Sequence, residues 1–64
     1  MQVILPDKTV VTRPGDPVPI ETILADLGMI PATIIVQKNG KIVPEDVIAS
    51  GDDQIRIIRI AHGG

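Results

Sequence analysis

The residues best placed for chemistry in this sequence are the last two, Gly63 and Gly64. A Gly-Gly end presents one reactive group, the α-carboxylate, which is ionised at neutral pH. A carboxylate is a poor electrophile, so it must first be activated, typically as an acyl-adenylate made with ATP. Because glycine has no Cβ, such a tail can enter a narrow active-site channel and leave the carbonyl carbon uncrowded. A frayed chain end is the plainer interpretation of the same two residues.

Few other side chains offer chemistry. The sequence has no cysteine and no aromatic residue, which excludes disulfides, thiol nucleophiles, zinc knuckles and platforms for stacking bases. The single histidine, His62, is interpreted as a tail contact near the reactive carbonyl or with an activating enzyme, or as a solvated residue. With no second type of ligand close to His62, we expect no metal site. Turn chemistry and solubility explain one group of acidic residues: Glu45, Asp46, Asp52 and Asp53.

The composition describes a small and mildly acidic chain. It has 64 residues, of which 44% are hydrophobic, and a formal net charge of −2, so it forms one domain at most. A domain of this size buries only about 60% of its unfolded surface, so we expect function on a surface or a terminus and no enzyme activity. The acidity argues against a nucleic-acid partner. No apolar run exceeds three residues and no signal peptide is recognisable, so we expect a cytoplasmic protein without a membrane partner.

Short β-branched runs bounded by turn residues predict five strands. Residues 2–5 and 9–12 are expected to form an N-terminal hairpin. Residues 32–38 and 41–43 flank Asn39-Gly40, the strongest hairpin signal in the chain, because a type I′ turn needs two positive φ angles. The last and most regular strand is predicted over 54–60.

One amphipathic helix is predicted between the two hairpins. Its apolar residues recur at i, i+3, i+4 and i+7, which is one helical stripe: Ile20, Ile23, Leu24 and Leu27. Gly28 follows the stripe, where a left-handed C-terminal cap is favourable. One further helical turn is expected over 45–48.

The predicted order is therefore ββαββ, a short turn and a final β-strand. One helix can cover one face of one sheet, which predicts an α+β domain of two layers over residues 1–60. The final strand must find a place in the sheet, so we expect a mixed sheet of about five strands with the last strand central, beside the first. Residues 61–64 are expected to form a flexible C-terminal tail.

The last strand also predicts a partner-docking patch. If Ile55 and Ile57 face the helix, alternation puts Arg56, Ile58 and Ile60 on the other face. An exposed apolar cluster beside the tail is a candidate docking surface, and its arginines can pair with acidic groups of a partner. The predicted patch comprises Ile4, Ile58, Ile60, Arg56 and Arg59. Ordinary surface residues are the plainer interpretation.

Six segments distributed along the chain carry a family resemblance. They are the opening MQVIL, the helix IETILADLG, the hairpin KNGKIVPED, the turn SGDDQ, the strand IRIIRI and the ending AHGG. Together they resemble the ubiquitin-like sulfur carriers of the ThiS and MoaD type, with a length closest to ThiS. Two features depart from the bacterial carriers. His62 stands where Ala or Ser is usual, in an HGG ending similar to that of the eukaryotic ubiquitin-related modifier, and Asp52-Asp53 lengthens the turn by one residue.

The resemblance implies a β-grasp fold and a role as a substrate of other enzymes. An E1-like adenylating enzyme of the ThiF or MoeB type would use ATP to adenylate Gly64, with Gly63 giving clearance and flexibility. Sulfur from a cysteine desulfurase or sulfurtransferase persulfide would displace AMP and leave a thiocarboxylate. The thiocarboxylate would pass sulfur to an acceptor synthase, such as thiazole synthase in thiamine biosynthesis. No bound cofactor is implied, and the lack of cysteine fits sulfur held only on the C-terminus.

Alternatives share parts of this chemistry. A ubiquitin-like modifier would join Gly64 to a lysine amine of another protein, and a related carrier would serve transfer-RNA thiolation or molybdopterin synthesis. A plain β-grasp interaction module would carry its two glycines incidentally. The small size favours the carrier, whereas His62 favours the modifier. In each case we expect the chain alone to be a monomer.

Overall fold

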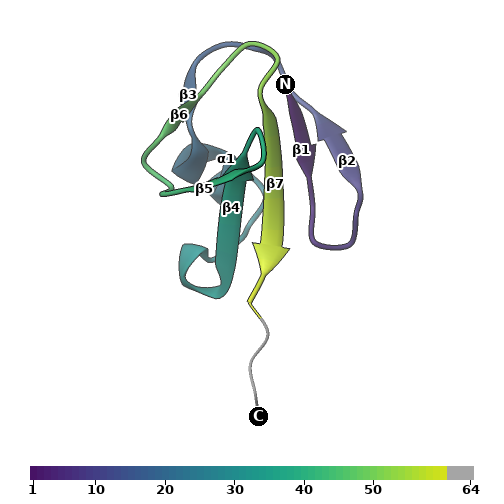
Figure 1. Ribbon diagram of the computed structural model, residues 1–64, viewed down its shortest axis with the longest axis vertical. Coiled ribbons are helices and arrows are strands. Elements are labelled where there is room, and N and C mark those ends of the chain that lie inside the picture. Colours follow the sequence, from purple (N-terminus) through teal and green to yellow (C-terminus); the bar gives the residue numbers. More distant parts are fainter. Residues whose placement is uncertain (61–64) are drawn as a thin grey trace.

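A mixed sheet of five strands forms one layer of the domain in the computed structural model, which describes residues 1–60 (Figure 1). Its strands are β1 (Gln2–Ile4), β2 (Val10–Thr12), β4 (Ile34–Lys38), β5 (Lys41–Val43) and β7 (Gln54–Arg59). The spatial order is β2-β1-β7-β4-β5, in which β1 and β7 are parallel and the other neighbours are antiparallel. The structure confirms the predicted mixed sheet with the last strand central, beside the first.

The second layer is the helix α1 (Ile20–Asp26), which buries Ile20, Ile23 and Leu24 against the sheet. It ends as the sequence predicts. Gly28 adopts a φ of 70°, and its N–H donates to the Ala25 carbonyl at 3.0 Å. The Met29 N–H donates to the Leu24 carbonyl at 2.9 Å, which completes a Schellman motif. The apolar stripe and its glycine cap therefore fix both the face and the length of α1.

A small second sheet is absent from the predicted order. It pairs β3 (Val18–Pro19) with β6 (Ile48–Ala49) in antiparallel register. Each of these strands has only two residues, too few for hydrophobic alternation to indicate a strand. Pairing with β6 fixes β3, the segment that leads directly into the N-terminus of α1. Ala49 of β6 is fully buried.

The predicted helical turn over 45–48 is wrong. The Glu45 and Val47 carbonyls accept hydrogen bonds from the first N–H groups of α1: Glu21 N–H to Glu45 O at 2.8 Å and Ile20 N–H to Val47 O at 2.9 Å. These bonds satisfy donors that every helix N-terminus leaves open. A helical turn would direct the two carbonyls along its own axis instead, so the segment crosses the end of α1 as a turn and then a strand.

Two further local features lie at the second hairpin. One separates the hairpin from α1, and the other closes it. A 3₁₀ turn, η1 (Pro31–Thr33), replaces the start of the strand predicted over 32–38, and the Thr33 N–H and hydroxyl both donate to the Ile30 carbonyl. At the hairpin turn, Asn39 and Gly40 have φ angles of 52° and 85°, which confirms the predicted pair of positive φ angles.

The core lies between the two layers and is entirely apolar among the described residues. On β7, Ile55 and Ile57 are buried, whereas the intervening Arg56 is exposed, as the alternation predicts. The buried set comprises Met1, Val3, Ile20, Ile23, Leu24, Val36, Ala49, Ile55 and Ile57. Among residues 1–60, no helix has the length and apolar character needed to cross a membrane.

Candidate functional site

The chemically reactive part of the predicted site falls on residues 61–64, which lie outside the described residues. This applies to Gly63, Gly64 and His62, and to the predicted tail as a whole. The structure does describe the strand that leads to them. β7 pairs with β1 on one side and with β4 on the other, and the Ile60 N–H donates to the Thr33 carbonyl at 3.0 Å. The chain is therefore paired with β1 up to Arg56 and held on the β4 side up to Ile60.

The predicted docking residues lie largely on the sheet face opposite the helix. Strand register places Ile4 beside Arg56, and Ile35 beside Ile58. Ile4 is half-buried, and Ile58 and Ile60 remain 37% and 38% exposed. The open face therefore combines apolar side chains with Arg56 in the middle of β7.

A groove of about 300 Å³ runs over this part of the face. We call it the β1–β7 groove, because its lining comes from β1, the loop after it and β7: Ile4, Leu5, Pro6, Lys8, Arg56, Ile57, Ile58 and Arg59. Four of the five predicted docking residues line it, and Ile60 does not. The sequence pattern did not indicate Lys8, which sits in the hairpin turn with a φ of 72°.

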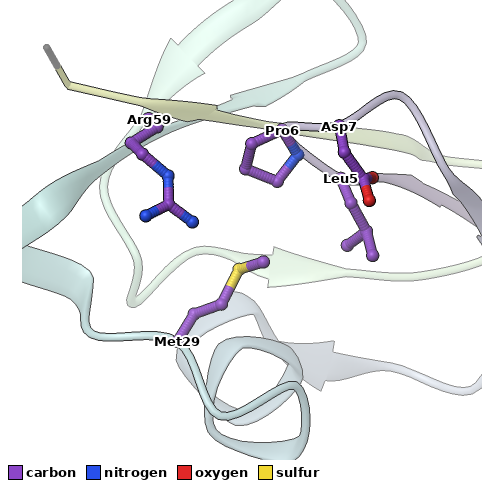
Figure 2. Close-up of a pocket in the computed structure, with 5 residues that line it drawn as sticks. All are labelled: Leu5, Pro6, Asp7, Met29 and Arg59. Carbon is purple, nitrogen blue, oxygen red and sulfur yellow. The ribbon is translucent and has the colours of Figure 1, made fainter.

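Arg59 also reaches the helix side of the sheet. It follows Ile57 by two positions, and alternation along β7 puts both on the helix side. There it lines a cavity of about 400 Å³ together with Leu5, Pro6, Asp7 and Met29. In Figure 2 the Arg59 side chain extends from β7 and the Met29 side chain rises toward the same space. Arg59 therefore lines hollows on the helix side as well as the β1–β7 groove, whereas Arg56 belongs to the open face.

The charges around these hollows are unevenly paired. Within the described chain, ion pairs join Arg13 to Asp26 at 3.1 Å and Lys38 to Asp53 at 3.6 Å, and they involve no cation of the β1–β7 groove. The Thr9 N–H donates to the Asp7 carboxylate at 3.0 Å and lowers the pKa of Asp7. Asp7 is thus ionised at neutral pH beside the second cavity, yet no ion pair joins it to Arg59.

A polar network surrounds Asp53 at the opposite end of β7. Its carboxylate accepts the Ser50 N–H at 2.9 Å and the Asn39 amide at 2.9 Å, and these hydrogen bonds lower the pKa of Asp53. The Asn39 side-chain oxygen in turn accepts the Gln54 N–H at 2.9 Å. Asp53 therefore ties the second hairpin to the start of β7, a role beyond the turn chemistry predicted for it.

The candidate site is thus the β1–β7 groove together with the carboxyl end of β7 that leads to residues 61–64. Among the residues that the structure describes, no cluster of three or more His, Cys, Asp or Glu side chains is arranged to hold a metal ion. A comparison of the sequence with models of known protein families found no match, and no curated protein matches it.

Proposed function

We propose that this domain is a β-grasp and that the chain is a ubiquitin-like sulfur carrier, with Gly64 as its reactive terminal residue. An E1-like enzyme would adenylate Gly64 with ATP, and the terminus would become a thiocarboxylate for sulfur transfer in thiazole formation for thiamine. The observation that carries the proposal is the course of β7. The central strand, paired on both sides, leads directly into a segment that ends in Gly-Gly.

The proposed chemistry needs no reactive side chain from this protein. The Gly64 carboxylate would attack the α-phosphate of ATP and release pyrophosphate. A persulfide sulfur would then attack the acyl carbon, and AMP would leave with one of the carboxyl oxygens. A thiol would cleave the resulting S–S bond and leave the thiocarboxylate. Because Gly63 has no Cβ, it would leave the acyl carbon open to both attacks.

The domain would supply the surface that the activating enzyme recognises. Ile58 and Ile60 are exposed large hydrophobic residues next to the tail, and Ile4 and Arg56 adjoin Ile58 in the β1–β7 groove. Arg59 would extend that contact toward the helix side of the sheet. A surface on paired strands positions a substrate segment better than a loop would.

The deciding experiment is the intact mass of the protein after reaction. The full chain is incubated with ATP, an adenylating enzyme from the same cell and a persulfide donor. We expect one terminal oxygen to be exchanged for sulfur in a reaction that depends on ATP. A variant lacking Gly64 is the matched control and should remain unchanged while its circular dichroism stays native. Absence of any modified terminus with several candidate activating enzymes would refute the proposal.

A protein modifier is the second candidate, because His62 gives the chain a His-Gly-Gly ending. Conjugation and sulfur transfer share the acyl-adenylate and differ in the nucleophile that attacks it. The same mass measurement separates them, since a modifier yields isopeptide-linked adducts on lysine. If the Gly64 deletion were adenylated normally, the tail would have no part in either mechanism. If neither a thiocarboxylate nor an adduct formed, a plain interaction module would remain.

A further inference from the structure

Half of the basic side chains of this acidic protein line one groove. The chain has six Lys and Arg residues against eight Asp and Glu residues. Three of the six, Lys8, Arg56 and Arg59, line the β1–β7 groove, and no acidic side chain is among its described lining residues. Arg13 and Lys38 are held in ion pairs elsewhere. The groove is therefore a local concentration of positive charge on a chain of net charge −2.

Backbone hydrogen bonds fix the main chain that carries these three cations. Lys8 sits in a closed turn, where its N–H donates to the Leu5 carbonyl at 2.8 Å and the Leu5 N–H donates to the Thr9 carbonyl at 2.8 Å. Arg56 and Arg59 belong to β7, the only strand of the described sheet that pairs with both β1 and β4. Binding of a partner that neutralises these charges would cost side-chain conformational entropy but little backbone entropy, which favours binding.

The floor between the cations is apolar. Ile4, Leu5, Pro6 and Ile58 line the same groove, and Ile58 is exposed. We propose that the β1–β7 groove binds an acidic protein segment in which apolar side chains stand between carboxylates. Apolar side chains would cover the floor and exclude water, which strengthens the pairing of carboxylates with Arg56 and Arg59 around it.

Charge complementarity favours a short protein segment over other polyanions. A nucleic acid would extend beyond a groove of this size on a chain of net charge −2, and the sequence offers no aromatic side chain for base stacking. A short segment can place its carboxylates only where the cations are. Assigning that segment to the activating enzyme rests on the proposed function, whereas the preference of the groove for it does not.

The test is a titration of the isotope-labelled full chain by nuclear magnetic resonance, without ATP or any enzyme. The probes are a soluble peptide that mixes Glu with Leu, its counterpart with Lys in place of Glu, and polyglutamate. We expect the Glu–Leu peptide to bind most tightly, to shift the amide resonances of Lys8 and Ile58, and to weaken as salt is added. Equal binding of polyglutamate, or shifts confined to α1, would overturn the proposal.

A matched pair of charge reversals tests the location. Arg56→Glu lies in the groove, whereas Lys41→Glu makes the same change in charge on exposed β5 outside it. Since an exposed ion pair changes affinity by up to about fivefold, we expect Arg56→Glu to weaken the peptide about fivefold to tenfold. Lys41→Glu should change affinity less than twofold, because Lys41 lies outside the groove and exposed charges contribute little. Arg56→Gln, which removes the charge without reversing it, guards against a folding defect and should weaken binding by a smaller factor.

Two results would overturn the inference outright. Equal losses in Arg56→Glu and Lys41→Glu would mean that only the overall charge matters. Tighter binding of single-stranded RNA or of anionic phosphatidylserine vesicles, with displacement of the peptide, would assign the groove to another class of ligand. The titration involves no adenylation, so the two proposals fail separately. A negative titration does not refute the proposed sulfur carrier, and a negative mass measurement does not refute binding of the peptide in the groove.

Discussion

The two faces of β7 can be distinguished by a pair of alanine substitutions. Ile57 and Ile58 are adjacent and chemically identical, but Ile57 is 1% exposed in the core and Ile58 is 37% exposed on the open face. Truncation of a fully buried isoleucine leaves a cavity and costs about 2 to 5 kcal/mol. Truncation of Ile58 removes apolar surface that water already partly reaches, at a cost of about 1 kcal/mol.

These costs are large on the scale of this domain. At about 0.05 to 0.15 kcal/mol per residue, a chain of 64 residues has a free energy of unfolding of about 3 to 10 kcal/mol. Ile57→Ala should therefore leave a large fraction of molecules unfolded if the stability lies near the lower end, whereas Ile58→Ala should remain folded throughout.

Urea denaturation followed by far-ultraviolet circular dichroism is the assay, because the chain has no Trp or Tyr for fluorescence. We expect the midpoint of Ile57→Ala to fall several times further than that of Ile58→Ala at an unchanged slope. Equal losses in the two variants would refute the assignment of faces along β7, and with it the placement of the β1–β7 groove on the open side.

Three further perturbations test other parts of the structure. Ile58→Glu should weaken binding to the activating enzyme while the urea midpoint changes little. Ile57→Glu should instead unfold the domain, because it buries a charge. Equal binding by Ile58→Glu and wild type would contradict the docking role. Gly28→Ala should cost about 1 to 2 kcal/mol in the same urea assay, because φ there is 70° although no atom obstructs a Cβ, and Gly28→Asn should cost less. The pKa of Asp53 is lowered from 3.8 in the folded chain, so its contribution to stability is present above that value and is lost as the pH falls through the lower folded value. Denaturation across a pH series should therefore show a shallower acid loss in Asp53→Asn than in wild type, with exposed Asp52→Asn as the control, and identical slopes in all three would exclude this contribution.

The features that the sequence predicted correctly are those encoded within a few residues. The stripe ending in Leu27 and Gly28 specifies the helix, and Asn39-Gly40 specifies a turn with two positive φ angles, because each signal depends only on neighbours in the chain. The alternation on β7 similarly separates buried Ile55 and Ile57 from the open face. The central position of β7 followed from topology, since a sheet opened by the first hairpin has one place left for a last strand.

The features that escaped prediction depend on residues distant in sequence. The Glu45 carbonyl is fixed by the Glu21 N–H, 24 positions away, and no local pattern at 45–48 indicates that bond. Asp53 meets Asn39 only because the second hairpin folds back beside the start of β7. Lys8 enters the groove through a positive φ that is uncommon for lysine, so its residue type gave no signal.

The parallel pairing of β1 with β7 has a consequence for how the domain assembles. Gln2 pairs with Gln54, so the centre of the sheet closes a loop of about 50 residues, and its entropic cost must be met before most of the core forms. Without β7, the β1–β2 and β4–β5 hairpins would lack a common neighbour, and an isolated two-stranded hairpin is at best marginally stable. Folding should therefore be all-or-none and comparatively slow, with β7 docking late. A partner that recognises the sheet would therefore bind the terminus attached to β7 only after the entire domain has formed.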